Sequence, residues 1–287
     1  MYIEVGGLRV GGRDRPLVIT SFDDSGVSYE SSDLTIPNRA GTYLGRDRQT
    51  ERTLTFTINT GGGIKNLSAA QHLADELTKV WTDSAAKKPG ELTEMVIETS
   101  PDRRRRIFGR CGKITAVNPD VRAMQGSVEL QAEFRWTDPI AYSEEDTTYS
   151  ISVVPAAEGG IKSPIIAPIK TVTWGGVGWR FVTNSGDRAS AMAIKLYGPC
   201  KNPRIGVNGK TVGLKHTLAY DEVITVNGKT GTVTNAAGAN VSRYLTSRSR
   251  LDALKLDPGT HEVSFTAEDT TQTARAEILY ADAYSNY

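Results

Sequence analysis

Two adjacent carboxylates, Asp23 and Asp24, are the pair in this sequence whose types and spacing suggest acid–base chemistry. Two carboxylates can share general acid–base work or hold a cation, but only when both side chains reach the same point. Successive residues of a strand point to opposite faces, and the following Ser25-Gly26 dipeptide is typical of a turn. We therefore interpret the pair as turn residues. A hydrolase that uses them as acid and base is the weaker alternative.

Other catalytic and metal-binding patterns do not occur in the sequence. There is no Gly-x-Ser-x-Gly motif, and the histidines His72, His216 and His261 stand singly. Cys111 and Cys200 lie far apart and form no Cys-x-x-Cys, so their spacing predicts no zinc or iron site. Two buried thiols are favoured over a disulfide. We predict that the protein is not an enzyme and uses no cofactor or metal.

A glycine run, Gly61–Gly63, precedes a predicted helix, which is where phosphate groups often bind. The run continues as Ile-Lys-Asn and therefore lacks the spacing and the Lys-Ser/Thr ending of a P-loop. We interpret it as a connector between a strand and the helix.

The charge balance argues against a protein that works by binding phosphates. The 34 basic residues and 33 acidic residues give a net charge of +1, without the basic excess typical of nucleic-acid-binding proteins. The one strong charge run is Arg103–Arg106, with Arg110 after it. In a strand these side chains alternate between two faces, so ion pairing at the surface or with a neighbouring chain is favoured over nucleic-acid binding.

The predicted elements indicate a mainly β protein of two domains. Residues 1–148 read as short strands with one amphipathic helix at about 67–83, whose apolar stripe is Leu73, Leu77, Val80 and Trp81. A connector rich in proline and glycine follows residue 136. Residues 149–287 read as evenly spaced strands separated by Gly, Asn and Pro, which predicts a β-sandwich.

Two segments predict local structure in more detail. The alternation in RTLTFTINT, residues 52–60, indicates a strand with one buried face and one wet face, and we expect it to offer an exposed edge. In EVITVNGKTGTVTN, residues 222–235, Asn227-Gly228 predicts a hairpin, because this dipeptide accepts a positive φ at both turn positions.

Exposed aromatic residues on a β-sandwich can stack on sugar rings, although aromatic residues also fill the cores of such folds. Trp174, Trp179 and Tyr220 are the candidates in the second domain. A carbohydrate-binding module that attaches to a glycan on a host surface is therefore the alternative function.

The first residues, MYIEVGGLRV, lack the basic start and apolar core of a secretion signal. No apolar run approaches the roughly 18 residues of a membrane span. We expect a protein that is made in a cytoplasm and does not insert into a membrane.

Several segments carry a resemblance to one family. IKLYGPCKNPRIGVNGK is a strand that ends in Gly-Pro with Asn-Pro shortly after, YDEVITVNGKTGTVTN is a strand–turn–strand, and LKLDPGTHEVSFTAED contains Leu-x-Pro-Gly. Upstream, GRDRQTERTLTFTINT is followed by the single helix and by EFRWTDPIAYSEE. In this order they resemble the distal tail proteins of bacteriophages with long, non-contractile tails. The resemblance covers nearly the whole chain and is strongest between about residues 130 and 285.

The resemblance implies an assembly role. The N-terminal domain would be a β-sheet or barrel that closes a homo-hexameric ring as a belt, and the C-terminal domain a galectin-like β-sandwich. The ring would be a hub in the virion, at the tail tip, after assembly in the host cytoplasm. It would join the tail tube protein to the tail-associated lysin or tail-fibre hub and to other tail-tip proteins. DNA would pass through its bore without sequence-specific binding.

A closed ring requires that one face of each subunit contact a different face of the next. We expect five arginines to form ion pairs with a neighbouring chain: Arg46, Arg48, Arg52, Arg104 and Arg106.

Overall fold

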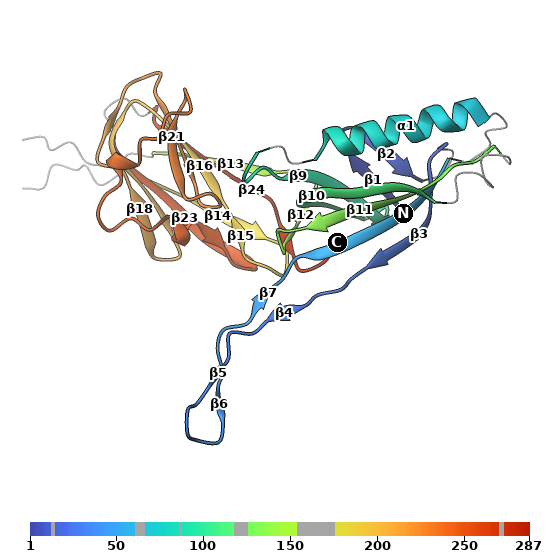
Figure 1. Ribbon diagram of the computed structural model, residues 1–287. Helices are drawn as coiled ribbons and strands as arrows, with labels where there is room; N and C mark the ends of the chain where they lie inside the picture. Colours follow the sequence, from blue (N-terminus) through green and yellow to red (C-terminus); the bar gives the residue numbers. More distant parts are fainter. Residues whose placement is uncertain (13–14, 61–66, 86–87, 118–125, 154–175, 270–272) are drawn as a thin grey trace, which may run out of the picture. The chain divides into compact units, whose positions relative to one another are not determined.

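The computed structural model describes residues 1–12, 15–60, 67–85, 88–117, 126–153, 176–269 and 273–287 (Figure 1). Within these residues the chain is mainly β, as the sequence predicts, and contains one α-helix. It divides into two compact units: residues 1–144 together with 284–287, and residues 145–283. The second unit is therefore inserted into the first.

One antiparallel sheet forms the frame of the first unit, with the strand order β2-β1-β9-β10-β11-β8-β3. β12 pairs with β10 and β25 with β12, beside this path. The strands are β1 (Tyr2–Val5), β2 (Leu8–Gly11), β3 (Val18–Asp24), β8 (Arg52–Asn59), β9 (Thr93–Ser100), β10 (Arg103–Val117), β11 (Glu129–Trp136), β12 (Ala141–Ser143) and β25 (Ala283–Tyr284). Strands β2 and β3 stand at the two ends of the path.

Strand β8 lies inside the sheet, so the expectation that it offers an exposed edge is wrong. It pairs with β11 on one side and with β3 on the other. Its predicted alternation is confirmed, because Leu54, Phe56 and Ile58 are fully buried while the threonines between them are half-buried. Alternation identifies the two faces of a strand. It does not identify the strands on either side, because these pair from segments distant in sequence.

Helix α1 (Leu67–Asp83) covers one face of this sheet and occupies the predicted range (Figure 1). Its buried positions follow the helical period: Ala70, Ala74, Leu77 and Trp81. The predicted Leu73 and Val80 are only half-buried beside them. The indole N–H of Trp81 donates a hydrogen bond to the carbonyl of Gly112 on β10 at 3.2 Å, which ties the helix to the sheet. Small alanines give little hydrophobic signal, so the sequence identified only half of this stripe.

Between β3 and β8 the chain leaves the sheet as a two-stranded arm (Figure 1). The arm pairs β4 (Tyr29–Glu30) with β7 (Arg48–Gln49), and β5 (Leu34–Thr35) with β6 (Thr42–Tyr43). Every residue from 29 to 44 is exposed, so this part of the arm adds nothing to the core of the unit. An isolated two-stranded hairpin is only marginally stable in water.

Two antiparallel sheets of five strands each form the second unit. One has the order β13-β24-β16-β20-β21, and the other has the order β14-β23-β17-β18 with β19 also paired to β17. The first contains β13 (Thr147–Ser152), β16 (Ala193–Tyr197), β20 (Val223–Asn227), β21 (Thr232–Asn235) and β24 (Arg275–Tyr280). The second contains β14 (Gly176–Asn184), β17 (Cys200–Val207), β18 (Lys210–Gly213), β19 (Thr217–Leu218) and β23 (Gly259–Glu268). Shorter elements are β15 (Ser190–Ala191) with β22 (Lys255–Leu256), η1 (Ser242–Tyr244) and η2 (Leu251–Ala253).

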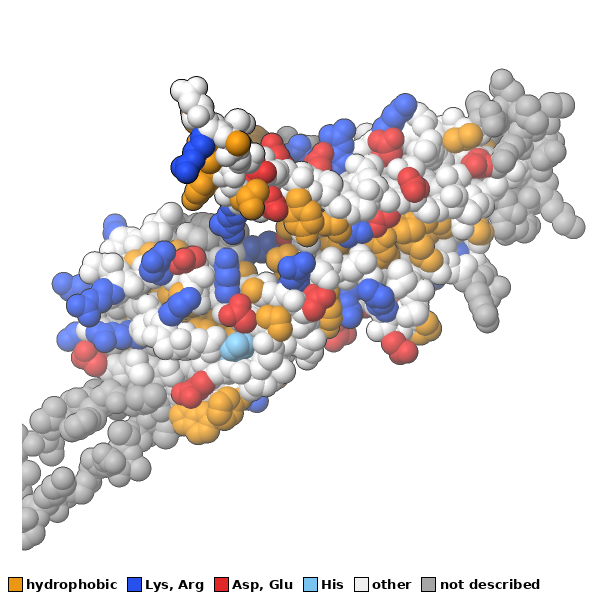
Figure 2. Space-filling view, turned by 90° about the horizontal axis from the view of Figure 1, so that it is seen from below, with side chains coloured by type: hydrophobic (Ala, Val, Ile, Leu, Met, Phe, Trp, Pro, Cys, Tyr) orange, Lys and Arg blue, Asp and Glu red, His pale blue; other side chains and the backbone are white. Residues whose placement is uncertain are grey.

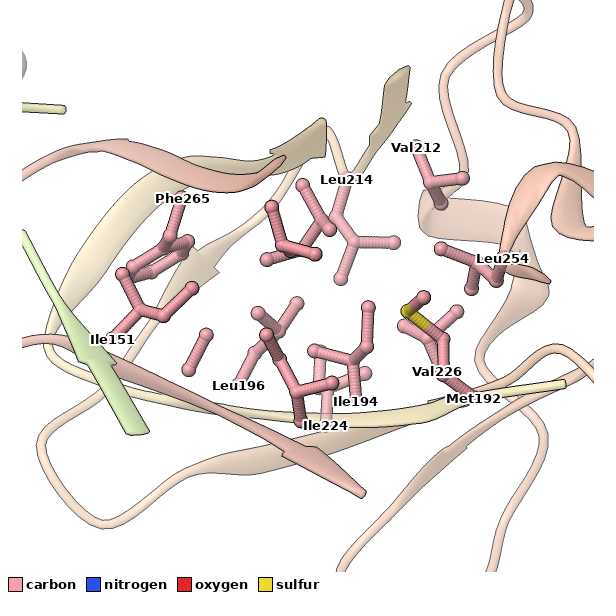
Figure 3. Close-up of a cluster of buried hydrophobic side chains, with 14 of the residues drawn as sticks. Ile151, Met192, Ile194, Leu196, Val212, Leu214, Ile224, Val226, Leu254 and Phe265 are labelled. Atoms are coloured by element: carbon pink, nitrogen blue, oxygen red, sulfur yellow. The ribbon is translucent and has the colours of Figure 1, made fainter. Parts of the chain in front are cut away.

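The two sheets share one hydrophobic core, in which side chains from both point toward one another (Figure 3). Ile194 and Ile224 come from the first sheet, and Val212 and Phe265 from the second. Along β16, β20 and β24 buried residues alternate with more exposed ones, which is the pattern of two sheets packed on their inner faces. The predicted sandwich is therefore present.

The predicted hairpin is present between β20 and β21, but its turn differs from the prediction. Asn227 pairs with Thr232, so the loop spans residues 228–231, and the positive φ of 66° belongs to Gly231. Gly228 is needed for another reason: a Cβ there would lie 2.7 Å from the carbonyl oxygen of Leu254. The backbone of a neighbouring segment thus fixes this turn.

The same tetrapeptide, Val-Asn-Gly-Lys, also occupies residues 207–210 and there forms the tight turn. Val207 pairs directly with Lys210, and the two residues between them have positive φ values, 48° at Asn208 and 78° at Gly209. This is the two-residue connection that an Asn-Gly dipeptide favours. Identical local sequence therefore gives two different turns in this protein.

Candidate assembly surface

The arm carries more than half of the exposed large hydrophobic side chains that the structure describes. Six of these eleven residues lie between residues 27 and 44: Val27, Tyr29, Leu34, Ile36, Tyr43 and Leu44. Leu44 is 78% exposed and Leu34 is 66% exposed. Figure 2 shows how hydrophobic side chains lie open on the surface among charged ones. The sequence does not indicate this surface, because its apolar residues follow neither a helical nor a strand period.

Two of the predicted interface arginines lie on the arm. Arg46 and Arg48 are both exposed, and Arg48 stands opposite Glu30 in the β4–β7 pair. The backbone N–H of Gly45 donates to the carboxylate of Asp33 at 2.8 Å, which joins the two strands of the arm. This hydrogen bond lowers the pKa of Asp33. The arm therefore presents apolar and charged groups together.

Arg52, another of the predicted arginines, is buried at the base of the arm with only 4% exposure. Its guanidinium forms a two-pronged ion pair with Asp24, and Nε lies 3.2 Å from Oδ1. The guanidinium carbon also lies 4.7 Å from the ring centre of Trp136 and 5.5 Å from that of Tyr287. Asn286 accepts a further hydrogen bond from it at 3.3 Å.

We call Asp24, Arg52, Trp136, Asn286 and Tyr287 the Arg52 cluster. It fixes the C-terminal tail of the chain to β3, β8 and β11 of the first unit, because the hydroxyl of Tyr287 donates to Asp24 at 2.7 Å. The sequence carries little sign that these residues return to the N-terminal sheet. Tyr280, Tyr284 and Tyr287 lie close together in it, but their spacing does not indicate which strands they contact.

Electrostatics within the Arg52 cluster favour a charged Asp24 and a neutral Tyr287. Burial alone would raise the pKa of Asp24, but hydrogen bonds from Arg52, Tyr287 and the N–H of Gly26 outweigh it and lower the pKa. Burial raises the pKa of Tyr287, and its hydrogen bond to Asp24 raises it further. Asp24 thus has a structural partner, whereas Asp23 beside it points to the other face and is exposed.

Arg104 and Arg106, the remaining predicted interface arginines, contact groups of their own chain. A guanidinium nitrogen of Arg104 lies 2.7 Å from Glu144 and 3.6 Å from Glu4. Arg106 donates to the carbonyl of Ser143 at 2.8 Å. A role for these arginines in contacts with another chain stays a prediction.

The aromatic candidates fall in different places. Trp174 lies outside the described residues, as does the Gly61–Gly63 run. Trp179 is 61% exposed on β14, and Tyr220, in the connection between β19 and β20, is 80% exposed. Phe181, which the sequence analysis did not select, is 58% exposed and packs edge to face with Trp179, with ring centres 5.4 Å apart.

Both cysteines are free and buried, as the sequence indicated. Burial raises the pKa of each thiol to about 12, so neither is a ready nucleophile. His216 stacks on Tyr244, with ring centres 4.0 Å apart, and lies 2.9 Å from a carboxylate oxygen of Glu222. In the part of the chain that the structure describes, no group of three His, Cys, Asp or Glu side chains is arranged to hold a metal ion.

The fold of this chain is similar to those of solved phage proteins. The crystal structure of the Dit protein of phage SPP1 matches with a TM-score of 0.62 and 13% identity, over 98% of each chain. That protein is described as a paradigm of the hub adsorption apparatus in phages that infect Gram-positive bacteria. The chain has a phage tail hub-like fold.

Two structures of the phage P2 baseplate in its activated conformation match at a TM-score of 0.49. The one with Ca shares 11% identity over 93% of this chain and 96% of that chain, and the one with Sr shares 12% over 94% and 98%. No protein-family model and no curated protein matches the sequence. No helix that the structure describes is long and apolar enough to cross a membrane.

Proposed function

We propose that the protein is a non-enzymatic structural subunit of a bacteriophage tail tip. Six copies form a hub ring that joins the tail tube to the baseplate and the receptor-binding apparatus, and DNA passes through the bore. The hub-like fold over almost the full chain supports this role. Its neighbours in the virion are the tail tube protein, the tail-associated lysin or tail-fibre hub, and other tail-tip proteins.

In this proposal, the predicted residues 1–148 form the ring-forming belt domain, to which residues 284–287 return, and the rest of the predicted range 149–287 forms a galectin-like domain. The two facing sheets of the second unit support the second assignment. Assembly takes place in the host cytoplasm, and no part of the protein inserts into a membrane.

The observation that carries the proposal is the exposed arm. Residues 29–44 have no buried side chain, yet the arm displays leucine, isoleucine and tyrosine to solvent. A two-stranded hairpin with this composition is stabilised when another surface covers it. In the ring, the arm of one copy contacts a different surface of the next copy. Such a head-to-tail contact forms a closed ring when the rotation between neighbouring copies brings the last copy back to the first.

Arg46 and Arg48 add charge to this contact. Both are exposed on the arm beside its apolar residues, and we propose that they form ion pairs with the next subunit. A rim of charge around an apolar centre is the usual composition of a protein interface. Arg104 and Arg106 contribute to a second contact in the same ring.

The first test is the mass of the protein in solution, by light scattering after size exclusion. One chain is 31.1 kDa, so a hexamer is about 187 kDa. Leu34→Asp with Leu44→Asp removes two apolar contacts, each of which contributes about 1.5–3 kcal/mol when buried. We expect this variant to run as a monomer that still unfolds cooperatively on heating, because neither residue belongs to the core.

The matched control is Leu92→Asp, which alters an exposed leucine of the first unit outside the arm. It should leave the hexamer intact. A hexamer that persists in the arm variant would show that the arm does not close the ring. A wild-type monomer that also fails to form rings on purified tail tubes would contradict the hub role itself.

A separate variant tests the arginines. Charge reversal at Arg46 and Arg48 should weaken the ring more at low salt than at high salt, because salt screens exposed charges. The same reversal at Arg104 and Arg106 tests the second contact. Equal mass at both salt concentrations would remove the ion pairs from the proposal.

A further inference from the structure

The outer face of the β14–β23–β17 sheet carries a cluster that the hub role does not use. Trp179 and Phe181 project from the outer face of β14, because the residue between them, Arg180, packs on Tyr149 and the next, Val182, is fully buried. The two exposed rings meet at 71°. Strand β14 stands at the end of its sheet path in the described residues, so both rings lie on a terminal strand of the sheet.

Polar groups occupy the neighbouring positions on this face. Residues directly opposite each other in an antiparallel pair share one face, so Trp179 stands beside Ser264, and Phe181 beside Glu262. One strand further, Gly206 stands beside Ser264. Gly206 lies two strands from Trp179, about 10 Å away. Because it has no side chain, nothing projects from the sheet at this position.

Three polar side chains on this face lack partners. The indole N–H of Trp179, the carboxylate of Glu262 and the guanidinium of Arg204 form no hydrogen bond or ion pair with the residues that the structure describes. Arg204 precedes Gly206 by two residues on β17, so it projects from the same face, opposite Thr266 of β23. The face thus offers two aromatic rings, one carboxylate, one guanidinium and several hydroxyl groups, all directed to solvent.

We propose that this face is a carbohydrate-binding site, with Trp179 and Phe181 stacking on pyranose rings. Glu262, Arg204 and Ser264 bind the sugar hydroxyls. A pyranose ring has apolar C–H faces and a rim of hydroxyls, so it requires aromatic rings beside donors and acceptors. The inference does not depend on the hub ring, and it adds Phe181, Glu262, Ser264 and Arg204 to the residues that the sequence indicated.

The size of the apolar cluster favours a sugar over a protein partner. Two aromatic side chains about 60% exposed present roughly 250 Å² of mainly apolar surface. A stable protein interface covers about 800 Å² on each partner, with an apolar centre. Here the neighbours of the two rings are Glu262, Ser264 and the Thr183–Thr260 pair, whose hydroxyls lie 2.9 Å apart. About 57% of such an interface is apolar, or roughly 450 Å² per partner, so the two rings present only a little more than half of the apolar area that it requires.

The test uses the full chain on an array of defined neutral and N-acetylated oligosaccharides. The affinity for each glycan that binds is then measured by calorimetric titration. We expect Trp179→Ala to reduce the affinity at least tenfold, and Phe181→Ala and Glu262→Gln severalfold. Tyr220→Ala is the matched control, because it removes another exposed aromatic ring of the same unit, and it should bind as wild type.

The outcomes separate this site from the hub ring. Absence of binding to every glycan, or equal loss in the Trp179 and Tyr220 variants, would overturn the proposal. If Trp179→Ala instead changes the mass of the assembly and binds glycan as wild type does, the face is a protein contact and the proposal is wrong. Arm variants that dissociate the ring should still bind glycan in the single-site titration.

Discussion

Replacing Arg52 tests how strongly the Arg52 cluster stabilises the first unit. Arg52→Met keeps most of the length of the side chain but removes its charge and its hydrogen bonds to Asp24 and Asn286. Removal of one partner of a buried ion pair costs about 3–5 kcal/mol, because the other charge stays buried without compensation. Asp24 keeps hydrogen bonds from Tyr287 and from the N–H of Gly26, so we expect the lower end, about 3 kcal/mol.

The assay is differential scanning calorimetry of the full chain, with the second unit as an internal reference. The two units have separate hydrophobic cores, so we expect two transitions. A loss of about 3 kcal/mol in the unit that holds Arg52 lowers its melting temperature by about 10 °C. The other transition should not move.

A double-mutant cycle with Asp24→Asn separates the ion pair from the packing of Arg52. The two single changes should be strongly non-additive, since the second removes the charge that the first leaves unpaired. A loss below about 1 kcal/mol in Arg52→Met, the value of an exposed ion pair, would refute the reasoning. Additive losses would refute it as well.

The pH dependence of the same variant gives an independent check. The folded pKa of Asp24 lies below its usual value of 3.8, so the carboxylate contributes stability above pH 3.8. This contribution is lost as the pH falls through the lower, folded pKa. The difference in stability between wild type and Arg52→Met should therefore be constant between about pH 5 and 7 and become smaller below about pH 4.

Three further predictions concern single residues. Gly228→Ala should destabilise the second unit in urea unfolding by about 2 kcal/mol, because its Cβ meets fixed backbone, while Gly231→Ala should cost only about 1 kcal/mol of left-handed strain; equal costs would contradict this. Cys111 and Cys200 should react with a thiol reagent only after unfolding, and fast labelling of the native protein would show that they are accessible. The pKa of Tyr287 is raised in the folded protein, so the stability that its hydroxyl contributes is complete below about pH 10 and falls at higher pH. In calorimetry, Tyr287→Phe should therefore be about 1 kcal/mol less stable than wild type at neutral pH, and this difference should disappear by about pH 11. A difference that persists at pH 11 would contradict the prediction.

Local pattern predicted the faces of the elements better than their partners. The alternation around Phe56 correctly gave the buried face of β8, and the helical period gave Leu77 and Trp81 of α1. Alternation carries no information on which strand lies alongside, so the interior place of β8 was missed. The two Val-Asn-Gly-Lys segments show the same limit, because Gly228 lies against the backbone of Leu254 and Met192, whereas no described atom lies within 4 Å of the Cβ position of Gly209.

The candidate site was harder to predict than the fold. Arginine runs drew attention to Arg52 and Arg104, but spacing could not show that Arg52 is buried with Asp24 or that Arg104 has acidic partners in its own chain. The apolar residues of the arm, such as Leu44, are individually unremarkable in sequence. Their exposure follows from the absence of any covering layer, which only the three-dimensional arrangement shows.

The insertion of the second unit has a consequence for folding during synthesis. The chain enters this unit at Glu145 and leaves it at Ala283, and the residues that follow return to the first unit. There Tyr287 contacts Asp24, and β25 pairs with β12. The first unit therefore acquires its last contacts only after the second unit has been synthesised.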